Sequence, residues 1–126
     1  MESLKEKKRF SIIARIKSST HAWRGIGILI KTSHSTWVQI FFGVLAVYLG
    51  CILHISATEW LFLVFAIGLV FITEAFNTAI EIEINLTSPE PHPYARDTKD
   101  VAAGAVLLSV ILSIIVALVI FLPKIL

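Results

Sequence analysis

The sequence predicts an all-α membrane protein, in which an N-terminal amphipathic surface helix precedes three transmembrane helices. Of the 126 residues, 56% are hydrophobic and 16% are charged, and the mean hydropathy is +0.83. Soluble domains usually have about 45–50% apolar and about 25% charged residues. The excess of apolar residues therefore predicts burial in a lipid bilayer. The length allows one domain, 1–126, and the single cysteine, Cys51, excludes a disulfide scaffold.

Positive charge is concentrated in the N-terminal region, residues 1–33. Eight basic and two acidic side chains in residues 1–31 give a net charge of +6, and the other 95 residues carry −4. Ile13 and Ile16 share a helical face, and Trp23 continues the apolar side further along. A cationic helix with such a face is suited to the lipid headgroup layer. Nucleic-acid binding by this basic segment is the alternative, which we reject because membrane spans follow directly.

Three apolar segments predict the spans, which we place at residues 37–58, 60–85 and 99–122. No charged side chain occurs between residues 37 and 55 or between residues 101 and 122. A membrane-crossing helix needs about 20 such residues. The segment 86–98 contains three alternating prolines and is predicted to be an extended loop, with helix able to restart at Pro93. In the first span, Ala46 and Gly50 are four residues apart, which favours close approach of a neighbouring helix.

Lysine and arginine are distributed unevenly around these spans. Eight lie in residues 1–31 and two in residues 85–100, whereas the turn at residues 54–59 has none and the C-terminal tail has one. The positive-inside rule therefore predicts a cytoplasmic N-terminus and 86–98 loop, with the C-terminus outside. Chemistry that uses cytoplasmic ATP is expected at the loop end of the second and third spans.

Polar side chains interrupt the second half of the middle span. At about 100° per residue, five of them fall on one face of the helix. They are Glu74, Asn77, Thr78, Glu81 and Asn85. Glu83 lies almost opposite, and we interpret it as the point where the helix leaves the membrane. Because carboxylates in a bilayer are costly unless paired, protonated or bound to metal, this stripe indicates a functional site.

The depth of each carboxylate suggests its chemistry. Glu74 is the deeper one, with Asn77 and Thr78 as neighbouring polar groups, and is suited to accept a proton from an alcohol. Glu81 is nearer the surface and suited to bind Mg²⁺. Lys99 and Asp100 begin the third span; the lysine suits phosphate oxygens and the aspartate adds a carboxylate. The alternative for both is an ordinary pair of charges at the membrane interface.

The string Glu74-x-x-Asn77-Thr78-Ala79-Ile80-Glu81, followed by Lys99-Asp100, resembles the prokaryotic diacylglycerol kinase family, which includes undecaprenol kinases. The resemblance extends from about residue 18 to residue 122, and Trp23-x-Gly25 matches the surface helix of that family. It implies a homotrimer in the bacterial cytoplasmic membrane that transfers the γ-phosphoryl group of ATP to a lipid alcohol, diacylglycerol or undecaprenol.

The resemblance also implies roles for individual residues. Glu74 would be the catalytic base, Asn77 would position substrate or phosphate, and Glu81 would bind Mg²⁺ and the nucleotide. Lys99 and Asp100 would contact ATP. Arg15 is the candidate for a further phosphate contact from the N-terminal region.

Two positions depart from the pattern of the family. Ser33 stands where many members have a glutamate that helps to hold metal, and Asn85 stands where an aspartate is usual. Both departures remove negative charge from the cation site. Two alternatives to a kinase therefore stay open: a kinase relative without activity, and a small transporter or proton-conducting subunit in which Glu74 relays protons.

Overall fold

The computed structural model describes the backbone of residues 2–126 and the side chains from residue 11 onward. The chain forms four helices, α1 (Glu2–Thr32), α2 (His34–Ile52), α3 (Ala57–Thr87) and α4 (Pro93–Ile125), and residues 2–126 contain no strand. Three of these, α2, α3 and α4, are long and apolar enough to cross a membrane. The predicted all-helical fold with three spans is confirmed.

The chain divides into two units, residues 1–32 and residues 33–126. The first unit is the single helix α1, whose backbone hydrogen bonds are made within the helix itself. Ile12, Ile16 and Trp23 on α1 are each more than half exposed. Exposed apolar side chains of this kind suit a membrane surface, and the position of α1 there stays a prediction.

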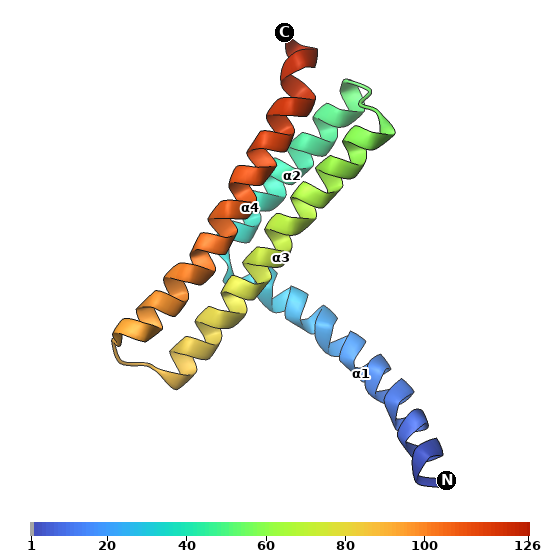
Figure 1. Cartoon of the computed structure of the whole chain (residues 1–126), viewed down its shortest axis with the longest axis vertical. Coiled ribbons are helices and arrows are strands. Elements are labelled where there is room, and N and C mark those ends of the chain that lie inside the picture. Colours follow the sequence, from blue (N-terminus) through green and yellow to red (C-terminus); the bar gives the residue numbers. More distant parts are fainter. Residues whose placement is uncertain (1) are drawn as a thin grey trace. The chain divides into compact units, whose positions relative to one another are not determined.

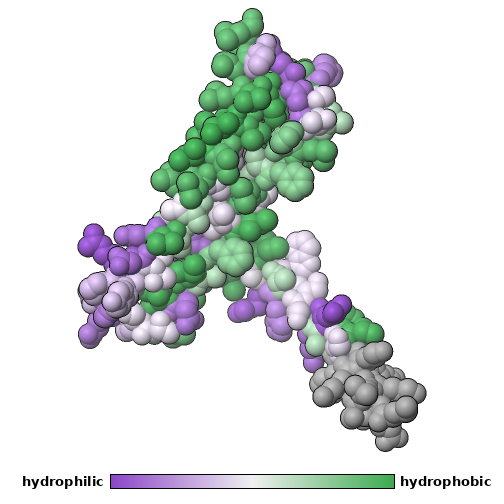
Figure 2. Space-filling view, viewed as in Figure 1, coloured by the Kyte–Doolittle hydropathy of each residue, from purple (hydrophilic) through white to green (hydrophobic). Residues whose placement is uncertain are grey.

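In the second unit, α2, α3 and α4 pack side by side, and the most extensive contact joins α3 to α4 (Figure 1). The face shown in Figure 2 is mostly hydrophobic between the two ends of these helices, and hydrophilic residues gather where α3 leads into α4 and, to a smaller extent, at the α2–α3 turn. An apolar exterior of this extent is stable in lipid rather than in water.

The α2–α3 turn lies next to the apolar core of the unit. Ile55, Leu63, Ile120 and Phe121 form the buried cluster, with Trp60 and Ala46 packed against it. A Cβ atom on Gly50 would lie 2.8 Å from Cη2 of Trp60, so only glycine permits this contact between α2 and α3. The expectation that small residues in the first span admit a neighbouring helix is confirmed at Gly50.

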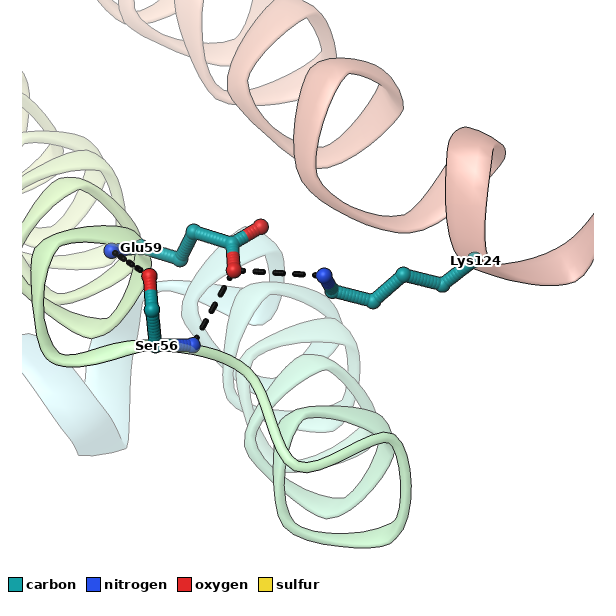
Figure 3. A network of polar contacts seen from close by, with 3 residues as sticks. All are labelled: Ser56, Glu59 and Lys124. Carbon is teal, nitrogen blue, oxygen red and sulfur yellow. Dashed lines mark hydrogen bonds and ion pairs between the residues drawn. The ribbon is translucent and has the colours of Figure 1, made fainter.

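A polar network closes this end of the unit (Figure 3). Ser56 caps α3: its hydroxyl oxygen accepts from the Glu59 amide at 3.2 Å, and its own amide donates to Glu59 Oε1 at 3.0 Å. Lys124 of α4 lies 3.2 Å from the same carboxylate oxygen. This capping box and ion pair therefore fix the start of α3 against the end of α4.

Helix α4 is longer than the predicted span 99–122 at both ends. It begins at Pro93, where His92 caps it by accepting from the Tyr94 amide at 3.1 Å, so only residues 88–92 separate α3 from α4. Proline is tolerated in a first helical turn, as expected at this position. At the other end the helix continues through Pro123 to Ile125. Pro123 lies in the last turn of the helix, next to Lys124, which forms the ion pair with Glu59.

Candidate active site

Glu74 lies in the middle of α3 and is only 4% exposed. Its Oε1 accepts a hydrogen bond from Ser33 Oγ at 2.8 Å, and its Oε2 accepts one from Gln39 Nε2 at 3.1 Å. Both donors come from the beginning of α2. The sequence suggested Asn77 and Thr78 as partners of this carboxylate; the hydrogen bonds are instead made by another helix. A buried carboxylate requires such donors, because burial removes its hydration.

The rest of the polar stripe divides by depth. Asn77 and Thr78 are buried like Glu74, while Glu81 and Asn85 are exposed. Asn77 Nδ2 donates to Glu81 Oε1 at 3.5 Å, a long hydrogen bond, and Asn77 Oδ1 is buried without a partner. The amide nitrogen of Asn77 therefore faces Glu81, and its oxygen is turned into the protein. Glu83, expected on the opposite side, is exposed.

The donor set can be compared with what Mg²⁺ requires. Among the described residues, no three histidine, cysteine, aspartate or glutamate side chains form a cluster that could enclose a metal. Mg²⁺ is usually held by one or two carboxylates, with water and substrate phosphates completing its coordination. Glu81, an exposed carboxylate, fits this partial type of site, in which water and the nucleotide would supply the remaining oxygens.

Lys99 lies near the loop end of the stripe. Its Nζ donates to Asn85 Oδ1 at 2.6 Å, which connects the last turns of α3 to the early part of α4. Asp100 follows it in α4 and is exposed, and Arg15 is exposed on α1. The structure thus groups Glu74, Asn77 and Glu81 along α3 and links Lys99 to that helix. No side-chain hydrogen bond or ion pair found among the described residues joins Asp100 to this group, and Arg15 belongs to the first unit.

A second polar contact between α3 and α4 was not anticipated from the sequence. Thr73 Oγ1 and Ser109 Oγ share a hydrogen bond at 2.9 Å, and Ser113 Oγ donates to the Ala66 carbonyl at 3.1 Å. Two serines four residues apart in a span are typical of a helix–helix contact, so the spacing of Ser109 and Ser113 was the available signal. These hydroxyls support the helix pairing that holds Glu74 in place.

An apolar groove of about 580 Å³ is bordered by α2, α3 and α4. Its walls are side chains such as Phe42, Leu49 and Phe71, and Gln39 lies in the wall. The same Gln39 donates to Glu74, so the groove and the buried carboxylate share this residue. Oε1 of Gln39 is buried without a partner. A mostly apolar groove with a few polar groups in its wall is typical of ligand sites.

The family model of the prokaryotic diacylglycerol kinases matches residues 20–121, which includes every polar residue of this site. The chain belongs to the prokaryotic diacylglycerol kinase family. The resemblance inferred from the residues of α3 and α4 is therefore confirmed, and with it the prediction of a membrane-embedded lipid kinase.

The relatives of this chain are named for two different lipid substrates, undecaprenol and diacylglycerol. The chain is 37% identical over 108 residues to the undecaprenol kinase of Bacillus subtilis, covering 86% of this chain and 88% of the relative. It is 36% identical over 110 residues to a diacylglycerol kinase of Synechocystis, and this match covers 86% of this chain and 63% of the relative. The diacylglycerol kinase of Escherichia coli K12 is 28% identical over 100 residues, covering 79% and 82%.

Proposed function

We propose that the protein transfers the γ-phosphoryl group of ATP to the hydroxyl group of a membrane lipid, with Glu74 as the general base. The observation that carries this proposal is a carboxylate buried in a span, held by two donors and adjoining an apolar groove. A lipid chain in the groove would bring its polar end toward Gln39 and Glu74. Membership of the kinase family supports the reaction class.

The chemistry can be assigned to the residues of the site. The lipid hydroxyl oxygen attacks the γ-phosphorus, Glu74 accepts the hydroxyl proton, and the bond from the γ-phosphorus to the bridging oxygen breaks, leaving ADP. Lys99 balances charge on the phosphate oxygens, Asn77 orients them, and Asp100 contacts the nucleotide. Mg²⁺ held by Glu81 and the phosphates would neutralise developing charge. Arg15 is assigned to the phosphates from the family resemblance alone.

Undecaprenol is our preferred acceptor over diacylglycerol. The match to a relative named undecaprenol kinase covers 88% of that relative, whereas the match to the diacylglycerol kinase at 36% identity covers 63%, and this supports the preference. The test is transfer of radiolabel from [γ-³²P]ATP with Mg²⁺ in mixed micelles that contain either lipid alone. We expect labelled lipid with undecaprenol and less with diacylglycerol. Absence of labelled lipid with both would contradict the kinase proposal.

The same assay separates the kinase from a proton-conducting or transporter subunit. A relay through Glu74 predicts ion flux across liposomes that is independent of ATP, and no labelled lipid.

We further propose that the enzyme is a homotrimer of the cytoplasmic membrane, with the N-terminus and the loop between α3 and α4 on the cytoplasmic side. Glu81 is exposed although its neighbours Asn77 and Thr78 are buried, so the site is open on one side within a single chain. A second subunit could complete it. Native mass measurement in detergent should find trimers, and fully active monomers would contradict this.

A further inference from the structure

We propose that Ser33 and Gln39 are positioning residues, which hold the Glu74 carboxylate in the orientation needed to receive the proton of the lipid hydroxyl. This inference rests on the proposed function, because it assumes that Glu74 is the base. It assigns a role in catalysis to the first turns of α2, outside the motif that the sequence indicates on α3 and α4.

The two donors reach different oxygens of one carboxylate. Ser33 Oγ is 2.8 Å from Oε1 and Gln39 Nε2 is 3.1 Å from Oε2, across 41 and 35 residues of sequence. Ser33 is the N-cap of α2 and has an extended backbone, with φ −98° and ψ 110°. Its side chain therefore does not follow the helical periodicity of α2. Long side chains lean back toward the N-terminus of a helix, so Gln39 can meet the same carboxylate from further along α2.

The orientation of the Gln39 amide is fixed by its partner. An ionised carboxylate only accepts hydrogen bonds, so the nitrogen of the amide must face Glu74 and the oxygen must face away. That oxygen, Oε1, is buried without a partner. Leaving a buried acceptor unpaired costs free energy, and Gln39 is therefore oriented by Glu74 at the expense of its own second hydrogen bond.

Two hydrogen bonds fix the orientation of the carboxylate plane and leave some of its acceptor positions free. A carboxylate has about four acceptor positions, so each oxygen that accepts one bond keeps one position for another donor. A free glutamate side chain would rotate about its terminal bond. Phosphoryl transfer depends on placing the attacking hydroxyl in line with the phosphorus, and a base of fixed orientation favours that geometry.

The position of Ser33 matters for charge as well as for orientation. A hydroxyl donor stabilises the ionised carboxylate and adds no charge of its own, whereas an acidic side chain at the same place would repel it. On the side of α2, Glu74 is therefore bonded to neutral donors alone. A carboxylate at position 33 would instead require a cation between it and Glu74.

The test is steady-state kinetics of the full chain in mixed micelles, with turnover normalised to folded protein. Ser33→Ala and Gln39→Leu should each lower kcat by about tenfold or more and leave KM for ATP within about twofold. Ser33→Thr keeps the hydroxyl and should restore most of the rate. Thr32→Ala is the matched control, because the Thr32 hydroxyl bonds to the Ile28 carbonyl of its own helix.

An infrared measurement gives a readout that does not depend on turnover. The carboxylate stretching bands of Glu74 are those that disappear in Glu74→Gln, and they should shift in Ser33→Ala and Gln39→Leu but not in Thr32→Ala. Wild-type kcat in both variants, or unshifted bands, would overturn the positioning role while the kinase proposal stands. If the wild type has no kinase activity although the bands shift in both variants, the proposed function is overturned instead.

Discussion

The two ends of the three-helix unit use a glutamate of α3 in different ways. Near the α2–α3 turn, Glu59 is bonded to Ser56 and paired with Lys124, and an apolar cluster packs beside it. In the other half, Glu74 has two uncharged donors, and nearby buried oxygens of Gln39 and Asn77 have no partner. Glu59, whose charge is paired with that of a lysine, has a structural role. Glu74, which is held by neutral donors near unpaired acceptors, is available for chemistry.

After substitution of the base itself, the removal of Glu81 is expected to have the largest effect on activity. Glu81→Ala should lower kcat/KM by about 100-fold or more and increase the Mg²⁺ concentration needed, because several kcal/mol of charge stabilisation depend on the cation. Glu83→Ala is the matched control, since Glu83 is also exposed but lies on the opposite face. Activity titrated against Mg²⁺ measures both, and equal effects would contradict the assigned site.

Close packing at the turn end predicts a loss of stability without a specific loss of catalysis. In Gly50→Ala the new Cβ would lie 2.8 Å from Trp60 Cη2, and we expect about 1–3 kcal/mol of destabilisation. In Gly43→Ala the nearest atom, Ile67 Cγ2, is 3.6 Å away, so stability should change by no more than about 0.5 kcal/mol. Reversible unfolding in detergent compares them, and similar losses would refute the packing account.

A smaller effect is expected at Lys99. In Asn85→Asp the hydrogen bond of 2.6 Å becomes an ion pair, which partly neutralises the lysine. Exposed ion pairs contribute about 0.2–1 kcal/mol, so KM for ATP should rise by a factor of about 1.4 to 5, with little change in kcat. The measurement is kcat and KM over a range of ATP concentrations. A lowered KM would instead show that the added carboxylate acts on the cation site more strongly than on Lys99.

The smallest effect is expected at Lys124. Its side chain is 31% exposed and that of Glu59 27%, so their ion pair should contribute only about 0–1 kcal/mol. Lys124→Ala should therefore lower the unfolding temperature slightly, by less at high salt, and leave turnover unchanged. A large loss of turnover would show that the two ends are not independent.

The helices and the polar stripe could be predicted because they depend on local hydropathy and on helical periodicity. The partners of Glu74 could not, because Ser33 and Gln39 lie 41 and 35 residues away and meet it only through packing of α2 on α3. Position 33 was recognised as a departure from the family, but its hydrogen bond depends on the extended N-cap conformation. The extension of α4 through Pro123 to Ile125 was not predicted either, because the charge-free segment is expected to stop at the proline.

The central claim is that Glu74, and not Glu59, is the glutamate of α3 that performs chemistry. Its most direct test is one substitution made at both ends, with lipid phosphorylation measured per folded protein. We predict that Glu74→Gln lowers kcat by about 10²–10⁴-fold and that Glu59→Gln keeps the wild-type kcat. Phosphorylation by Glu74→Gln at the wild-type rate would contradict the account.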